Sequence, residues 1–293
     1  MTAEPFLSIG MPVRNGRTTI ALAIASVRLQ TYRNWELIVL DDGSTDGTPD
    51  VVRAIDDARI RLVADGKGEG IPRRRNQILD MARGPLFAWM DSDDVAYPRR
   101  FERQVAFLQQ HPEVDLVAAE MIAFRGEGEI VGKRAMPVAH DEICRRPLSG
   151  FPLAQPTFTG RLEWFRRFGY DERVARGSDQ DLLLRAYETS RYAGMKEVLV
   201  GYREEQVRLR KTLVGRWWFS RRALVESRRR GMLAAGVTAA LAQGAKAAAD
   251  IVAVVTGLNY RILRHRARPV TDAERSEWQA VWQQAKAAAT TGR

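Results

Sequence analysis

Short apolar segments rich in β-branched and aromatic residues recur along the first half of the chain and alternate with segments of helical periodicity. The former are typical of buried strands, and apolar residues three or four apart are typical of amphipathic helices. The pattern predicts strands at residues 6–11, 35–40, 60–64, 86–90 and 114–119. It predicts helices at residues 18–29, 49–55, 73–82 and 98–110. This alternation favours an α/β fold with a mostly parallel central sheet flanked by helices.

The composition is that of a folded protein with one sizeable core. The chain has 293 residues, of which 45% are hydrophobic and 28% are charged, so intrinsic disorder, collagen and disulfide scaffolds are excluded. Cys144 is the one cysteine in the sequence, and we interpret it as a small buried residue in a reducing compartment. The first eleven residues lack the pattern of a secretion signal. We therefore expect a cytoplasmic protein.

Basic charge is concentrated at the C-terminal end of the sequence. Residues 1–204 hold 29 basic and 30 acidic residues, a net charge of −1, whereas residues 205–293 hold 17 basic and 6 acidic residues, a net charge of +11. We therefore predict a catalytic or binding domain at residues 1–204 and a basic, mainly helical C-terminal extension at residues 205–293. A tail of this kind suits an anionic partner, either a membrane leaflet or a nucleic acid.

The extension mixes aromatic and basic side chains around Trp217 and Trp218. Such a mixture suits a membrane headgroup region as well as a nucleic-acid surface. Residues 232–258 are long and Ala-rich, but Lys246 and Asp250 would each cost about 2.5–3.5 kcal/mol at a bilayer centre. We therefore expect a helix that lies on the membrane or against the body, with Lys246 and Asp250 one turn apart on its polar side.

A last helix is predicted after a capping box at residues 271–274, with Trp278 and Trp282 on one face. The simpler alternative for the whole extension is that it packs over the domain at residues 1–204 and leaves its arginines in solvent.

Two predicted strands end in acidic clusters, at the edge where open parallel sheets bind ligands. One cluster begins Asp41-Asp42-Gly43, and the other is Asp91-Ser92-Asp93-Asp94. Each could cap the following helix, but a cap needs one short polar side chain, and clustered carboxylates cost stability unless something offsets their charge. Alternate carboxylates in the second cluster suit Mg²⁺ or Mn²⁺ that also holds a diphosphate. The sequence has three histidines and no Cys/His spacing typical of zinc ligands, so a zinc site is not favoured.

A third acidic segment, Ser178-Asp179-Gln180-Asp181, precedes an apolar helix. Its carboxylates could simply favour the positive end of that helix. Alternatively, one of them lies at the mouth of the same cleft and acts as a general base toward a hydroxyl nucleophile. The basic run at residues 73–75 begins another predicted helix, where cations call for an anionic partner, although Arg73 and Arg74 could equally form a solvated face.

Five motifs occur in order between residues 6 and 203. They are Met11-Pro12-Val13-Arg14-Asn15-Gly16; Ser26-Val27 with Gln30-Thr31-Tyr32; Trp35-Glu36-Leu37-Ile38-Val39-Leu40-Asp41-Asp42-Gly43-Ser44-Thr45-Asp46; Arg75-Asn76; and Met90-Asp91-Ser92-Asp93-Asp94. Together they closely resemble the family 2 glycosyltransferases, which have the GT-A fold.

This resemblance implies an inverting, metal-dependent enzyme that uses a nucleotide-diphosphate sugar. It implies that the donor is bound by Pro12, Val13, Asn15, Asp41, Asp42, Arg75, Asn76, Asp91 and Ser92. It implies that Asp93 and Asp91 hold Mn²⁺ or Mg²⁺, and that Asp179 is the catalytic base, with Asp181 as the rival. Family members commonly have Glu-Asp where this chain has Ser178-Asp179, and many have histidine where it has Gln155.

The resemblance also implies a glycan or lipid-linked acceptor of envelope or exopolysaccharide assembly, which fits a cytoplasmic enzyme peripheral on the inner face of the plasma membrane. A nucleotidyltransferase on a similar sheet is the first alternative, because it too needs carboxylates and a metal. That class normally has a glycine-rich basic loop where this chain has Pro12-Val13-Arg14-Asn15. A nucleic-acid-binding protein is the second alternative, but it leaves the acidic cleft unexplained, so nucleic acid is not the expected partner.

Overall fold

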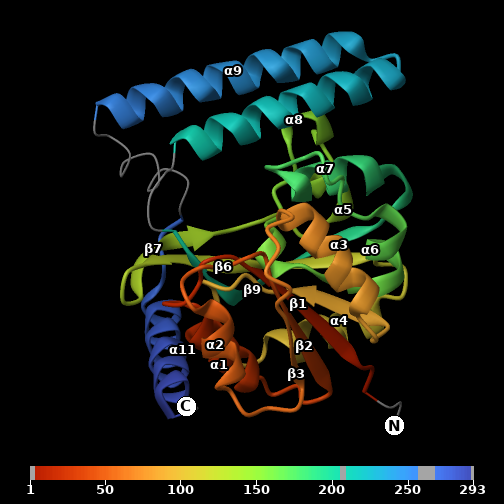
Figure 1. Ribbon diagram of the computed structural model, residues 1–293. Helices are drawn as coiled ribbons and strands as arrows, with labels where there is room; N and C mark the ends of the chain where they lie inside the picture. The colour runs from red at the N-terminus through yellow and green to blue at the C-terminus, as the bar shows by residue number, and fades with distance from the viewer. Residues whose placement is uncertain (1–3, 205–208, 257–267, 292–293) are drawn as a thin grey trace.

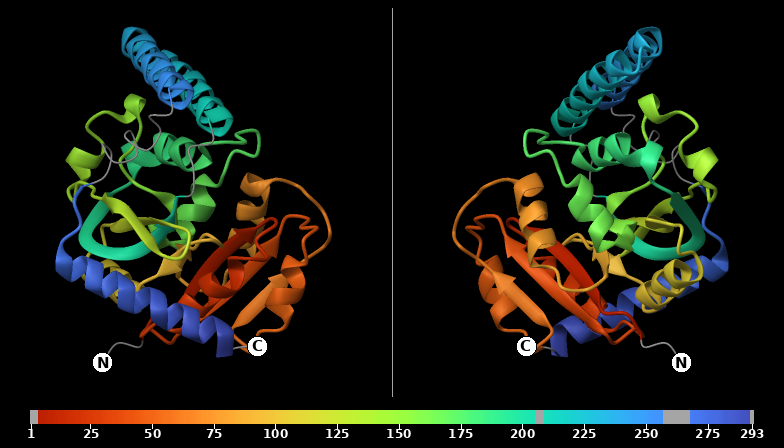
Figure 2. Two further views of the ribbon diagram at one scale, coloured as in Figure 1. Left: turned by 90° about the vertical axis from the view of Figure 1, so that its left-hand side faces the viewer. Right: turned by 90° about the vertical axis from the view of Figure 1, so that its right-hand side faces the viewer.

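The computed structural model describes residues 4–204, 209–256 and 268–291 (Figure 1). Within these ranges nine strands form one sheet in the order β3-β2-β1-β4-β8-β6-β9-β5, and β7 pairs with β6. Helices cover both faces of this sheet, and two long helices project from one end of the molecule (Figure 2).

The parallel half of the sheet contains the acidic strand ends. Its strands are β1 (Leu7–Val13), β2 (Trp35–Asp41), β3 (Ile60–Val63) and β4 (Leu86–Trp89), and β1 pairs in parallel with both β2 and β4. The helices between them are α1 (Ile20–Arg28), α2 (Thr48–Arg53) and α3 (Ile71–Met81). These elements confirm the predicted alternation, with ends that differ from the predicted ones by at most two residues.

The other half of the sheet is mixed. It contains β5 (Val95–Ala96), β6 (Leu116–Arg125), β7 (Glu129–Arg134), β8 (Thr159–Arg161) and β9 (Tyr192–Arg203). β8 pairs antiparallel with both β4 and β6, while β9 runs parallel to β6. The helices here are α4 (Arg100–Gln110), α5 (His140–Ile143), α6 (Leu162–Phe168) and α7 (Ser178–Ala186). The sheet is thus parallel where the sequence motifs lie and mixed beyond them.

The core lies on both faces of the sheet, because β1, β2 and β4 are buried along their whole length. On one face, Ile9 and Leu37 pack with Ile24 of α1. On the other face, Trp89 and Phe165 pack with Leu183 of α7. Packing on both faces explains why these strands appear in the sequence as continuous apolar runs rather than as alternating patterns.

The extension contributes α8 (Leu209–Arg229), α9 (Leu233–Val255) and α11 (Asp272–Thr291). The first two form an antiparallel hairpin that stands away from the sheet, and α11 lies at the opposite end of the molecule (Figures 1 and 2). Trp278 and Trp282 of α11 pack against Phe124 of the sheet, which confirms their predicted common face. The capping box is also confirmed, because Glu274 N donates to Thr271 Oγ1 at 3.2 Å and Thr271 N donates to Glu274 Oε2 at 2.9 Å.

Lys246 and Asp250 lie one turn apart on the polar side of α9, opposite its exposed apolar residues, as predicted. Asp250 is 4% exposed and forms a salt bridge of 2.7 Å with Arg216 of α8, whereas Lys246 is exposed. By length and composition α9 could cross a membrane, and most of it is exposed.

Candidate active site

A cavity of about 1120 Å³ lies at the carboxyl ends of β1, β2 and β4. The predicted site residues that line it are Pro12, Asp42, Arg75, Asp91, Ser92, Asp93 and Asp179. These residues come from three strand ends, the first turns of α3 and the first turn of α7. The structure therefore brings carboxylates from three separate stretches of chain to one cavity.

Asp42 is a buried carboxylate held by the loop that precedes α3. Its Oδ1 accepts hydrogen bonds from Glu69 N at 2.6 Å, Gly70 N at 2.9 Å and Arg74 Nε at 3.2 Å. The loop approaches the end of β2 closely at Gly43, where φ is +71° and a Cβ would lie 2.9 Å from Gly68 N. Glycine at position 43 thus permits the contact that fixes Asp42.

The solvated face suggested for Arg74 is wrong. Arg74 is 1% exposed and forms salt bridges with Asp42 at 3.2 Å and with Asp65 at 2.6 Å. The Arg74 guanidinium also holds the pKa of Asp65 below its usual range. Arg73 remains half exposed and pairs with Glu69 at 3.2 Å. The basic run at the start of α3 therefore divides between one buried structural arginine and its more accessible neighbours.

Arg75 crosses the cavity from α3 to α7. Its Nη1 donates a hydrogen bond of 2.9 Å to Ser178 Oγ, and its guanidinium carbon lies 5.3 Å from the centre of the Tyr170 ring. The positive charge of Arg75 lowers the pKa of Asp91, while Asp93 and Asp179 raise it. Arg75 thus offsets part of the negative charge that the cavity gathers.

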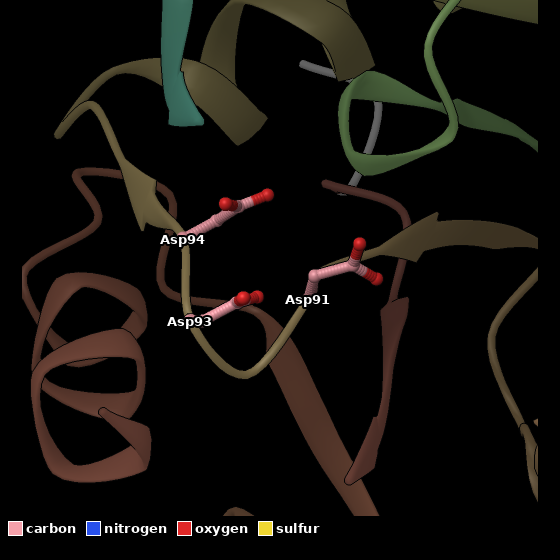
Figure 3. Close-up of side chains that lie close together, drawn as sticks. All are labelled: Asp91, Asp93 and Asp94. Carbon is pink, nitrogen blue, oxygen red and sulfur yellow. The ribbon is translucent and has the colours of Figure 1, made fainter. Parts of the chain in front are cut away.

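The turn after β4 holds three carboxylates whose oxygens lie within 4.8 Å of one another, namely Asp91, Asp93 and Asp94 (Figure 3). Burial is the main cause that raises the pKa of Asp91 to about 6, and it also raises the pKa of Asp94 well above its usual range. Arg203 N donates to Asp94 Oδ1 at 2.8 Å, while Asp94 Oδ2 has no hydrogen-bond partner within the part of the chain that the structure describes. An oxygen-only donor set with an unpartnered buried oxygen fits a hard divalent cation such as Mn²⁺ or Mg²⁺.

Asp179 and Asp181 occupy different environments although both lie in the first turn of α7. The helix follows Gly177, whose φ of +71° allows the chain to turn. Asp179 is half-buried and lines the cavity. Asp181 is buried outside the lining, accepts a hydrogen bond of 2.9 Å from Arg185 Nε and forms a short salt bridge with Arg222 of α8. Its charge is thus engaged by two arginines.

Four predicted donor-binding residues do not line the cavity but lie next to lining residues in the chain. Asn15, with φ of +54°, accepts a hydrogen bond of 2.9 Å from Thr45 N, and Asp41 Oδ2 accepts one of 2.9 Å from Ser44 N. Asn76 Oδ1 accepts a hydrogen bond of 2.7 Å from Tyr170 N. Val13 is buried in β1 beside Asp41. The hydrogen bonds of Asn15, Asp41 and Asn76 hold the loops next to the cavity in place.

Several lining residues were not among the predicted site residues: Arg14, Glu69, Arg134, Glu172, Arg176, Tyr202 and Glu204. Arg14 belongs to the first motif, and its Nη1 lies 3.8 Å from Asp42 Oδ2. Arg134 and Glu204 come from β7 and the end of β9 and pair at 2.6 Å. The sequence carries no local signal for this pair, because the two strands meet β6 from opposite sides only in the folded sheet.

The sheet order and the acidic cavity at its carboxyl edge define a GT-A fold. Residues 8–173 match the family model described as Glycosyl transferase family 2, so the chain belongs to the family 2 glycosyltransferases and is a glycosyltransferase.

Curated relatives agree with this assignment. The chain is 35% identical over 213 residues to the putative glycosyltransferase EpsE of Bacillus subtilis (strain 168), a match that covers 70% of the chain and 75% of that protein. It is 40% identical over 102 residues to the UDP-Glc:alpha-D-GlcNAc-diphosphoundecaprenol beta-1,3-glucosyltransferase WfgD of Escherichia coli, which covers 35% of the chain and 40% of that enzyme.

Solved structures share the fold at low sequence identity. TarS of S. aureus in complex with UDP-GlcNAc superposes with a TM-score of 0.62 at 16% identity, covering 96% of this chain and 92% of that one. The mannosyltransferase PcManGT of Pyrobaculum calidifontis, in complex with GDP-Man and Mn²⁺, gives a TM-score of 0.58 at 18% identity, covering 99% and 88%. The GT-A fold is thus common to all three.

Proposed function

We propose that this glycosyltransferase moves a sugar, with inversion, from a nucleotide-diphosphate donor to a hydroxyl group of a glycan or lipid-linked acceptor. The observation that carries the proposal is the convergence of Asp42, Asp91, Asp93 and Asp179 on one cavity. Carboxylates at the carboxyl edge of a parallel sheet suit a ligand that brings its own cation and a hydroxyl that must lose a proton.

In the proposed donor complex the nucleoside lies against the end of β2. Asp42 already accepts three hydrogen bonds at Oδ1, so its Oδ2 is the oxygen oriented toward Arg14 and the ligand. Pro12 and Ser92 line the cavity on either side of the parallel strand ends. Arg75 would contact the diphosphate, because it is a cation that both lines the cavity and acts on Asp91.

Asp93 and Asp91 would hold the divalent cation, joined by Asp94, which the sequence did not identify as a ligand. When bound, the cation supplies positive charge that stabilises the departing nucleoside diphosphate. Arg100 lies behind these carboxylates, buried and hydrogen-bonded to the carbonyl oxygen of Trp89 at 2.8 Å. Burial raises the pKa of both Asp91 and Asp94, and the positive charge of Arg100 opposes part of that rise.

The proposed base is Asp179, which removes the proton from the acceptor hydroxyl as its oxygen attacks the anomeric carbon. The bond from that carbon to the diphosphate oxygen breaks on the opposite face, so the sugar is inverted and the proton ends on the carboxylate. Asp181 is the weaker candidate, because its carboxylate already forms salt bridges with Arg185 and Arg222. The Arg75 bond to Ser178 keeps the first turn of α7 facing the donor.

The acceptor side of the proposal rests on relatives. WfgD and WfaP of Escherichia coli are named as glucosyltransferases that act on a diphosphoundecaprenol-linked sugar. A lipid-linked acceptor is presented at a membrane, so we propose a cytoplasmic enzyme peripheral on the inner face of the plasma membrane. In the proposed division, residues 1–204 carry catalysis and residues 205–293 meet the anionic surface. The predicted boundary adjoins residues 205–208, which lie outside the described residues.

A ligand and transfer assay tests this function. Thermal unfolding is measured with UDP, GDP and other nucleoside diphosphates, each with and without Mn²⁺, and the correct donor nucleotide should raise the Tm only when the cation is present. The corresponding labelled nucleotide sugar is then offered with diphosphoundecaprenol-linked sugars. Transfer of label to the lipid supports the proposal. Absence of nucleotide binding in every combination contradicts it.

A further inference from the structure

The outer helix of the hairpin carries an exposed apolar stripe. Its exposed large side chains are Leu233, Val237, Leu241, Ile251, Val252 and Val255. The spacing of four residues among the first three, and the positions of the last three, place all six on one face of an α-helix. Leu241 is 71% exposed and Val255 is 78% exposed, so these side chains lie mostly in solvent and do not belong to a core.

The opposite face of α9 packs on α8. Gly236, Ala239 and Ala253 are buried there, and a Cβ at Gly236 would collide with the Ser227 side chain. Asp250 lies on the same inner face, in its salt bridge with Arg216. Since α9 is the outermost element of the molecule, its apolar stripe points away from the protein (Figures 1 and 2).

The neighbouring helix α8 carries exposed aromatic and basic side chains. Trp217 is 57% exposed, and the exposed arginines of the helix are Arg210, Arg221, Arg228 and Arg229. Arg221 lies beside Trp217 and Trp218, with its guanidinium carbon 5.8 Å and 5.6 Å from their ring centres. Adjacent indole rings and arginines suit the headgroup region of a bilayer, because the rings can contact the acyl chains and the arginines can contact hydrated anionic headgroups.

We propose that the α8–α9 hairpin is an interfacial anchor for an anionic bilayer, in which the apolar stripe of α9 enters the headgroup region and the exposed arginines of α8 bind lipid phosphates. A spanning helix is the less favourable arrangement. Crossing the bilayer would pull α9 away from α8, break the Arg216–Asp250 salt bridge and leave Asp250 uncompensated in hydrocarbon. Lying flat keeps these contacts.

The anchor adjoins the wall of the active-site cavity. Arg222 of α8 forms salt bridges with Asp181 of α7 and, at 3.7 Å, with Asp171. Gly215 of α8 lies against Arg176, which lines the cavity. A bilayer bound by the hairpin would thus lie on the side of the molecule that carries Asp179. Delivery of a lipid-linked acceptor from that side rests on the proposed function, whereas membrane binding itself does not.

Vesicle flotation of the full chain tests the anchor, with phosphatidylcholine vesicles that contain or lack phosphatidylglycerol. Wild-type protein should float with the anionic vesicles and be released by high salt or alkaline carbonate. The double variant Leu241→Glu/Val252→Glu should lose flotation. The matched control Gln279→Glu/Gln284→Glu puts the same charge on exposed positions of α11, at the far end of the molecule, and should float like wild type. Arg221→Gln/Arg228→Gln should bind about fivefold more weakly per arginine removed.

Nucleotide binding in solution, which should be equal in all four proteins, distinguishes failure of the anchor from failure of the proposed function. Three results overturn the anchor: equal flotation on neutral and anionic vesicles, retention in the membrane after carbonate, and loss of flotation in the α11 control. A wild-type oligomer that the stripe variant converts to monomer, without vesicle binding by either, assigns the stripe to self-association instead and also overturns it.

Discussion

Arg75 of α3 donates a hydrogen bond of 2.9 Å to the hydroxyl group of Ser178 in α7, a residue 103 positions later in the chain. The bond joins α3, which follows the loop that holds Asp42, to the helix that carries the proposed base. Burial raises the pKa of Asp91, and the charge of the same guanidinium opposes part of that rise. One side chain therefore connects the proposed metal turn, the proposed diphosphate site and the helix that carries Asp179.

Asp179→Asn should reduce kcat by about 10²- to 10⁴-fold, because the amide cannot accept the acceptor hydroxyl proton. Donor binding should persist, since Asp179 is not expected to contact the nucleotide. Turnover and the Kd of the nucleoside diphosphate with Mn²⁺, measured on the same preparation, check both parts. Asp181→Asn is the comparison: it should lower the Tm by weakening the pairs with Arg185 and Arg222, with turnover per folded molecule retained. If Asp181→Asn loses turnover and Asp179→Asn keeps it, the assignment is reversed.

Asp93→Asn should weaken cation binding by more than the about 10- to 100-fold loss that is typical of changes outside the ligand shell. Calorimetric titration of Mn²⁺ in the presence of the nucleoside diphosphate measures this directly. Chelation of the wild type should abolish transfer, and added Mn²⁺ should restore it. Asp80→Asn removes the same charge at an exposed position of α3 and serves as control. Equal Mn²⁺ affinity in both variants would exclude Asp93 as a ligand.

Arg74→Met should destabilise the fold by about 3–5 kcal/mol, because it removes the buried cation that lies 3.2 Å from the buried Asp42 carboxylate. Urea unfolding gives this free energy. Arg73→Met, at the half-exposed neighbouring position, should change it by less than about 0.5 kcal/mol. Equal effects at both positions would mean that the pair of Arg74 with Asp42 does not matter for stability.

The elements of the parallel half of the sheet could be predicted because β1, β2 and β4 are buried along their whole length and because strands and helices follow one another closely in sequence. β5 and β8 could not, since strands of two and three residues have no periodicity, and their pairing with β9 and β4 is decided by distant parts of the chain. The antiparallel contribution of β8 is likewise invisible before the chain folds.

The sequence predicted which types of residue form the site, but not which of several neighbouring residues faces the cavity. Adjacent residues on a helix point about 100° apart, so the basic run on α3 does not say which arginine turns inward to Asp42, and Arg74 does. Residues two apart on a helix face nearly opposite sides, so Asp179 and Asp181 could not both face the cavity. Asp94 joins Asp91 and Asp93 only because the chain turns sharply after β4, a feature that alternation along an extended segment does not express.

The last prediction concerns Glu36 in β2, which is 2% exposed and remote from the cavity. Burial alone would raise its pKa, but hydrogen bonds from Arg83 and Ser8 outweigh burial, so the pKa of Glu36 lies below its usual value. Ser8 Oγ donates at 2.8 Å and Arg83 N at 3.0 Å to Oε1, and Arg83 Nε donates at 3.0 Å to Oε2. The carboxylate thus links β1, β2 and the segment before β4.

Because the pKa of Glu36 is lower in the folded than in the unfolded chain, the unfolded state binds the proton more readily. The stabilisation is therefore complete above the unfolded pKa of about 4.3 and is lost as the pH falls through the folded value. Glu36→Gln should cost about 1–3 kcal/mol of unfolding free energy near neutral pH, and the difference from wild type should shrink below about pH 4. Urea unfolding across this range measures the difference, with the exposed Glu163→Gln as control. A gap between Glu36→Gln and wild type that stays constant with pH would show that ionised Glu36 gains nothing from Arg83 and Ser8.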